Sequence, residues 1–114
     1  MHLEVSFRNL NPRDEVRQRA QALFKKMEHF LDPAAEGQLI VAVEHGSAIV
    51  EMVVHTRGAT FKSQEEDPDL RASLDKAMHS MENQLRRSKE KRVNRKGDSD
   101  LQGFEEADEE PTVV

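Results

Sequence analysis

The chain contains no cysteine, no tryptophan and no tyrosine among its 114 residues. The absence of cysteine excludes disulfide bonds, thiolate metal sites and a thiol nucleophile. Five phenylalanines are the only aromatic residues, which disfavours a stacking platform for single-stranded bases. No apolar run approaches the ~20 residues that cross a bilayer, and the first residues lack the basic start and apolar core of a secretory signal. We therefore expect a cytoplasmic protein with no membrane partner.

Motifs for catalysis and cofactor binding are also missing. The sequence has no nucleophile elbow, no HExxH zinc motif and no glycine-rich phosphate loop. The five histidines are scattered, and none has the i, i+4 spacing of a helical metal site. The acidic run from Glu65 to Asp69 lacks the spacing of a calcium loop and fits a helix start, where carboxylates are favoured. We expect no enzyme, no cofactor, no metal ion and no small-molecule substrate.

Hydrophobic periodicity predicts four strands and two helices. The first helix opens at Asn11-Pro12, carries an apolar stripe from Val16 to Leu31, and ends at Asp32-Pro33. Turns are expected at His45–Ser47 and at Arg57–Ala59. The four expected strands are His2–Arg8, Gln38–Glu44, Ala48–Thr56 and the short Thr60–Gln64.

The second helix is predicted over Pro68–Lys96, with Asp67 as its cap. Its apolar stripe begins at Leu70 and stops at Leu85, while good helix formers continue. From Arg86 to Lys96 the cations point all around the axis, seven Lys and Arg against one acid. A helix end of this kind projects from a core and attracts a polyanion.

The order β-α-β-β-β-α predicts an α+β fold of two layers. A right-handed crossover makes the first two strands parallel, and two hairpins add the others antiparallel. Both helices then cover one face of a four-stranded sheet. We assign residues 1–96 to this domain. Residues 97–114 hold seven acids, no base and no periodicity, and are expected to form an acidic disordered tail.

The net charge of −5 hides a slightly basic domain, because residues 1–96 hold all 17 Lys and Arg but only 15 of the 22 acids. Clustered cations suit phosphate binding, since several counterions are displaced at once. Without aromatics or a base-reading motif, recognition of folded RNA by shape is expected. For the first helix alone, an ordinary solvated charged face remains the alternative. The candidate RNA-binding residues are Arg8, Arg13, Arg17, Lys25, Lys26, Lys76, Arg86, Arg87, Lys89, Lys91, Arg92 and Arg95.

Several segments resemble the bacterial ribosome hibernation promoting factor family, and within it the short members. The similar segments are Arg8-Asn9, Phe24–Glu28 with Phe30–Asp32, Asp69-Leu70, Ala72–Asp75, Gln84-Leu85 with the alternating Arg87, Lys89 and Lys91, and the acidic tail with its single Phe104. The chain departs from the family pattern at Phe7, Leu23, Arg71 and Ser80.

The resemblance implies the same β-α-β-β-β-α fold. It also implies binding to small-subunit rRNA in the channel for mRNA and tRNA, and inhibition of translation under stress or in stationary phase. The chain is expected to act on single ribosomes, as short members do, and to be monomeric when free. Two interpretations of the tail stay open: it folds back on residues 86–96 as a competitor, or it occupies the mRNA path with Phe104 as an anchor.

Two alternatives from other classes remain. A general double-stranded-RNA-binding module has the order α-β-β-β-α, which this chain contains, and would bind free duplex RNA as tightly as ribosomes. A small enzyme would require a cleft with paired titratable groups, which the spacing does not supply.

Overall fold

The computed structural model describes the backbone of residues 1–102 and the side chains of residues 1–91. The last helix extends past Lys96, the expected end of the domain, to Gln102. Most of the acidic tail predicted for residues 97–114 therefore lies outside the described residues.

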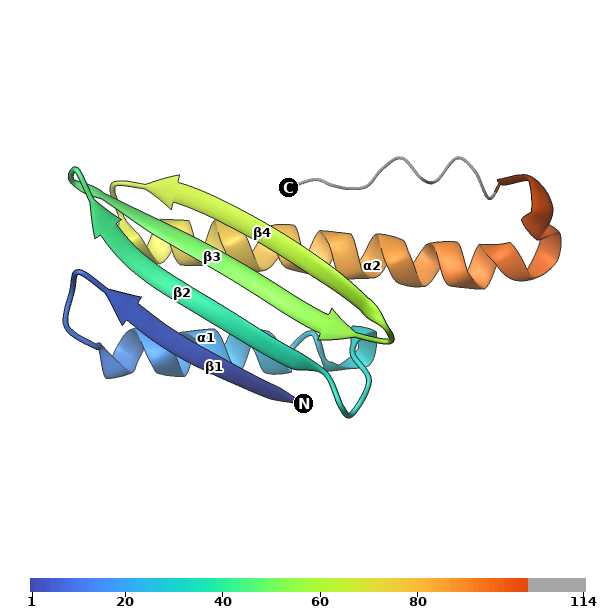
Figure 1. Cartoon of the computed structure of the whole chain (residues 1–114), viewed down its shortest axis with the longest axis horizontal. Helices are drawn as coiled ribbons and strands as arrows, with labels where there is room; N and C mark the ends of the chain where they lie inside the picture. Colours follow the sequence, from blue (N-terminus) through green and yellow to red (C-terminus); the bar gives the residue numbers. More distant parts are fainter. Residues whose placement is uncertain (103–114) are drawn as a thin grey trace.

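The elements follow the predicted order β-α-β-β-β-α, with one added 3-10 turn (Figure 1). The four strands form one sheet in the order β1-β2-β3-β4, with β1 parallel to β2 and the other pairs antiparallel. Both helices lie behind the same face of the sheet, which confirms the predicted two-layer α+β fold. The elements are β1 (His2–Arg8), α1 (Asp14–Lys25), η1 (Glu28–Phe30), β2 (Glu36–Glu44), β3 (Ser47–Thr56), β4 (Ala59–Asp67) and α2 (Leu70–Gln102).

Two-residue turns join the antiparallel strands. His45 and Gly46 have φ angles of 51° and 80°, and Arg57 and Gly58 have 53° and 76°. Two consecutive left-handed residues give the turn that matches the right-handed twist of a hairpin, and glycine adopts this conformation without a steric penalty. These turns are shorter than the predicted ones, so β3 and β4 each begin one residue earlier.

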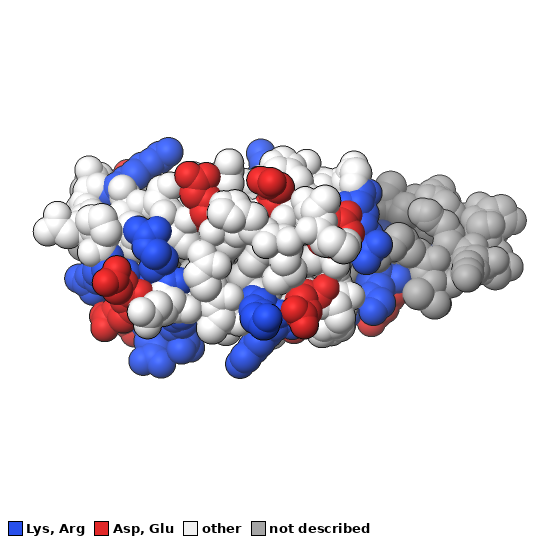
Figure 2. Space-filling model, turned by 90° about the horizontal axis from the view of Figure 1, so that it is seen from below, with Lys and Arg blue, Asp and Glu red and all other residues white. Residues whose placement is uncertain are grey.

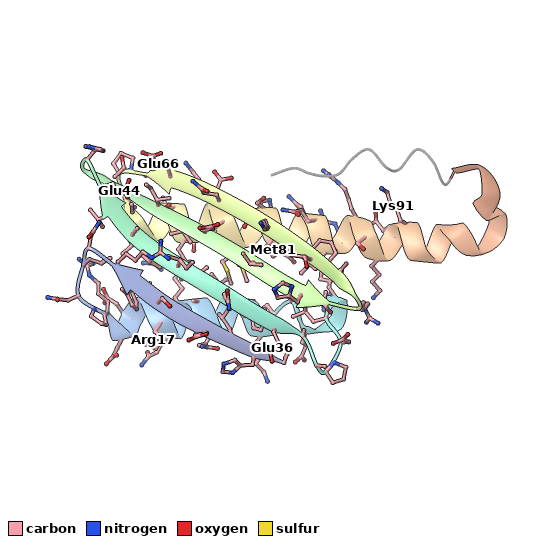
Figure 3. The ribbon with its side chains drawn as sticks, viewed as in Figure 1. Arg17, Glu36, Glu44, Glu66, Met81 and Lys91 are labelled. Atoms are coloured by element: carbon pink, nitrogen blue, oxygen red, sulfur yellow. The ribbon has the colours of Figure 1, made fainter. Side chains whose placement is uncertain are left out.

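The core lies between the sheet and the helices. Alternate residues of the strands point into it, and the predicted stripes of both helices meet them. The fully buried side chains include Leu39, Val50 and Met52 from the sheet and Leu74 and Met81 from α2 (Figure 3 labels Met81). The apolar periodicity of the sequence thus located the core correctly.

Helix α1 is shorter than predicted. The α-helix ends at Lys25. After it, the Met27 N–H donates to the Phe24 carbonyl at 3.0 Å, and the Phe30 N–H donates to the Met27 carbonyl at 2.8 Å. Bonds over three residues, rather than four, define a 3-10 turn. Met27 and Phe30 remain buried, so the apolar pattern continued although the helix type changed.

Two other strand boundaries differ from the prediction. Strand β4 has nine residues and is not short, because it pairs along the whole of β3 as far as Asp67. Strand β2 begins at Glu36, which places Gly37 inside the sheet. A Cβ at Gly37 would lie 3.1 Å from the Phe24 ring, so glycine allows this ring to pack on the strand.

The cap of α2 is Asp69 and not Asp67. The Asp69 carboxylate accepts from the Arg71 N–H at 3.2 Å, at the first turn of the helix. Asp67 instead accepts from the Asp69 N–H at 2.9 Å and pairs with Lys76. Pro68 therefore precedes the cap, because β4 continues to Asp67 and the helix starts at Leu70.

Candidate nucleic-acid interface

The two layers carry opposite charge. In the helix layer, residues 13–26 and 70–91 hold eleven Lys and Arg against five Asp and Glu. The four strands hold two Lys and Arg against seven Asp and Glu. Figure 2 looks at the edge of the molecule and shows blue side chains at several points along its lower, helical margin. A polyanion is therefore attracted to the helix layer and repelled from the sheet.

Several exposed cations lie at the ends of the packed helices. Arg13 precedes α1, and Lys25 and Lys26 follow each other at its end. Arg86 and Arg87 are exposed on α2 immediately after Leu85, the last buried side chain among residues 70–91. Because these side chains are exposed, they can contact phosphates without any change in the packing of the core.

Helix α2 extends well beyond the sheet (Figure 1). Lys91 lies on this projecting segment in Figure 3, and the Arg86 guanidinium donates to the Asn83 side chain at 2.6 Å. The Lys89 ammonium lies 5.6 Å from the centre of the Phe30 ring, within range of a cation–π contact. The side chains of Arg92 and Arg95 lie outside the described residues. The predicted projection of a cationic helix end is present in the backbone.

Arg17 has a structural role that the sequence did not reveal. Its Nη1 donates to the Val5 carbonyl at 3.1 Å, and its guanidinium carbon lies 5.3 Å from the centre of the Phe7 ring. Gln21, one turn later, donates to the Leu3 carbonyl at 2.9 Å. Strand β1 is an edge of the sheet, and these contacts occupy two carbonyls that an edge would leave open.

Two ion pairs also engage helix cations. Arg19 makes a two-pronged pair with Asp75, both bonds at 2.8 Å, which joins α1 to α2. Hydrogen bonding to Arg19 lowers the pKa of Asp75, against the opposing effect of its burial. The Lys76 ammonium lies 2.8 Å from the Asp67 carboxylate, and this hydrogen bond raises the pKa of Lys76 and lowers that of Asp67. Both pairs keep their charged forms at neutral pH.

Arg8 does not join the other candidates. It is exposed at the end of β1, where the alternation of the strand directs it to the face of the sheet that the helices leave open. The structure thus gathers the helix candidates on one layer and separates Arg8 from them. Sequence analysis missed Asp75 as the partner of Arg19, and no sequence signal links two residues 56 positions apart.

Residues 1–91 contain no group of three or more metal-ligating side chains placed to hold an ion. Among the described helices, none is long and apolar enough to cross a membrane.

Comparison with known proteins identifies similar chains. Ribosome hibernation promoting factor of Azotobacter vinelandii is 27% identical over 95 residues, covering 83% of this chain and 89% of that one. Ribosome hibernation promoting factor of Klebsiella oxytoca is 25% identical over 91 residues, covering 80% and 96%.

Two solved structures share the fold. The N-terminal domain of Thermus thermophilus protein Y matches with a TM-score of 0.70 and 24% identity, covering 76% of this chain and 98% of that one. A ribosomal subunit interface protein from Coxiella burnetii matches with a TM-score of 0.63 and 25% identity, covering 78% and 98%. The family model described as "Sigma 54 modulation protein / S30EA ribosomal protein" matches residues 3–93. The chain belongs to this family of ribosome-associated proteins, the one the sequence resembled.

Proposed function

We propose that this protein is a non-enzymatic translation inhibitor that acts in the cytosol on the small ribosomal subunit. Its helix layer binds rRNA in the channel for mRNA and tRNA, and its body blocks that channel. The relatives named ribosome hibernation promoting factor support the ribosome as the partner. The name of the Coxiella structure, a ribosomal subunit interface protein, supports a site between the subunits.

One observation carries the proposal: cations and acids are separated between the two layers. With eleven cations against five acids, the helix layer has a net charge of +6, although the whole chain is acidic. Binding that releases counterions from phosphates needs several cations on one surface. The sheet, with its excess of acids, would face away from rRNA.

The projecting end of α2 is the strongest part of this surface. Leu85 is the last buried side chain in the described part of α2, and the helix continues beyond the sheet (Figure 1). Arg87 is exposed there, whereas Arg17, Arg19 and Lys76 are already engaged within the protein. We therefore expect Arg86, Arg87 and the cations of residues 91–96 to contribute more to rRNA binding than the cations in the middle of either helix.

Co-sedimentation with purified small subunits in a sucrose gradient tests the proposal. The double variant Arg87→Glu with Lys91→Glu is expected to lose co-sedimentation, because it places acids where phosphates would bind. Lys89 is left unchanged, since it packs over Phe30 and its loss would disturb the fold. A native circular dichroism spectrum of the variant shows that only the surface has changed.

The matched control is Lys62→Glu, which makes the same reversal on an exposed lysine of the sheet. It is expected to co-sediment normally. If the Arg87 and Lys91 variant still binds, or the Lys62 variant binds equally poorly, the helix layer is not the binding surface. A free RNA duplex, added as competitor in the same assay, addresses the general duplex-binding alternative: competition as strong as that of subunits would support it.

A further inference from the structure

The face of the sheet opposite the helices has an apolar centre. Alternate strand residues point to this face, and the strand register places them in rows. One row is Ser6, Ile40, Glu51 and Gln64, and the next is Arg8, Ala42, Ile49 and Glu66. Val53 follows on β3, opposite Lys62. The four aliphatic residues belong to the two interior strands and are partly exposed, with no helix over them.

Glu51 lies in the middle of this apolar centre. Its cross-strand partners are Ile40 on β2 and Gln64 on β4, and Ile49 and Val53 are its same-face neighbours along β3. The side chain is partly buried, and it makes no hydrogen bond or ion pair with any other residue among the described side chains. A half-buried carboxylate with aliphatic neighbours and no ion-pair partner of its own gains from a cationic partner.

The margin of the face is acidic as well. Figure 3 shows Glu36 at one end of the sheet and Glu44 and Glu66 at the other. With Glu4 and Glu51 there are five glutamates on this face against Arg8 and Lys62. The face thus combines an apolar centre with a net negative charge of −3, the reverse of the helix layer.

We propose that this face docks a basic protein segment, one in which Lys or Arg alternates with aliphatic residues. Its aliphatic side chains would cover Ile40, Ile49 and Val53, and one cation would reach Glu51. The long apolar stem of Lys or Arg suits this position, because it can lie along aliphatic side chains while its head meets the carboxylate. The proposal goes beyond rRNA binding, and it assigns a partner to the layer that rRNA would not contact.

Charge complementarity selects this occupant over three others. RNA would bring phosphates to five glutamates and would find no Phe, Tyr or Trp on this face for stacking. A second copy of the chain would bring an equal net negative charge, with ten glutamates facing only four Lys and Arg across the interface. Residues 97–114 carry seven acids and no base, so the chain's own tail is repelled too. Proteins that accompany RNA are rich in Lys and Arg, because they neutralise phosphates.

Nuclear magnetic resonance of the full-length isotope-labelled chain tests the proposal without ribosomes. The probe is a synthetic peptide of alternating lysine and leucine, and the matched probe has glutamate in place of lysine. The lysine peptide is expected to shift the amide signals of Ile40, Ile49, Glu51 and Val53. Glu51→Gln keeps the shape of the side chain and removes its charge. It is expected to weaken peptide binding roughly fivefold, because one ion pair that is partly screened by solvent is lost. Glu90→Gln on α2 removes an exposed carboxylate outside the face and should leave affinity unchanged.

Several results would overturn the inference. One is a set of shifts confined to residues 97–114, which would show binding to the acidic tail alone. Another is equal affinity of the wild type and the Glu51→Gln variant. Shifts on the sheet that appear without peptide as protein concentration rises would assign the face to a second copy. The two proposals can fail separately. If the wild-type chain did not co-sediment with subunits, the ribosome proposal would fail, while peptide binding would still decide the inference about the sheet face.

Discussion

Arginines of similar sequence context serve different purposes in this protein. Arg17 and Arg19 both lie on α1, yet Arg17 closes the edge of β1 and Arg19 joins α1 to α2. Arg87 is exposed on the projecting end of α2. Periodicity places a residue on a helix face, but its partner comes from a distant segment that only the tertiary fold brings close. For this reason the sequence identified the basic surface and did not separate structural cations from available ones.

The ion pair between Arg19 and Asp75 predicts a pH-dependent stability. Because the pKa of Asp75 is lower in the folded than in the unfolded chain, the pair stabilises the fold above the ordinary carboxyl pKa of about 3.9. This contribution is lost as the pH falls through the folded value. We expect Asp75→Asn to be less stable than the wild type at neutral pH, with the difference shrinking in acid. Urea unfolding at several pH values measures it, and a difference that is constant down to pH 2 would contradict the assignment.

At the scale of elements, hydrophobic periodicity predicts the four strands and two helices in the correct order, but it does not predict where several of them end. Apolar spacing cannot distinguish an α-helix from a 3-10 turn over three residues, so the end of α1 at Lys25 was missed. The sequence alone also does not distinguish Asp67 from Asp69 as the cap of α2. Asp67 is held in β4 by pairing with Ala48, so Asp69 became the cap.

The cap of α2 gives a prediction at the same scale. Asp69→Ala removes the acceptor for the Arg71 N–H and is expected to lower the free energy of unfolding by about 1 kcal/mol. Asp69→Ser keeps a capping oxygen and should retain most of the stability. Thermal or urea unfolding of the two variants checks this. Equal stability of both variants would mean that the first turn of α2 does not depend on a side-chain cap.

At the scale of the whole molecule, the separation of charge between the layers was only partly predictable. The cationic stretches of the helices are visible in the sequence, but the acids of the strands are dispersed along it. The register of the sheet gathers Glu4, Glu36, Glu51 and Glu66 on one face. The sequence therefore does not reveal the open sheet face, and the acidic run from Glu65 to Asp67, which the sequence analysis assigned to a helix start, lies in β4.

This separation predicts the salt dependence of ribosome binding. If the helix layer contacts about five phosphates, the logarithm of the binding constant should fall against the logarithm of salt concentration with a slope of about −4. Equilibrium binding to fluorescent small subunits over a range of potassium chloride gives the slope. The Arg87 and Lys91 variant should show a shallower slope than the Lys62 control. A slope near zero for the wild type would indicate an apolar interface.

Directed cleavage of rRNA tests the central claim, that the helix layer faces rRNA in the channel for mRNA and tRNA. Because the chain has no cysteine, a single one can be introduced to carry an iron chelate that generates hydroxyl radicals. Two exposed sites on opposite layers form the pair: Glu90→Cys on α2 and Gln64→Cys on β4. We expect the chelate at position 90 to cut small-subunit rRNA that lines the channel, and the one at position 64 to cut it weakly. Stronger cleavage from position 64, or cleavage from position 90 only outside the channel, would contradict the account.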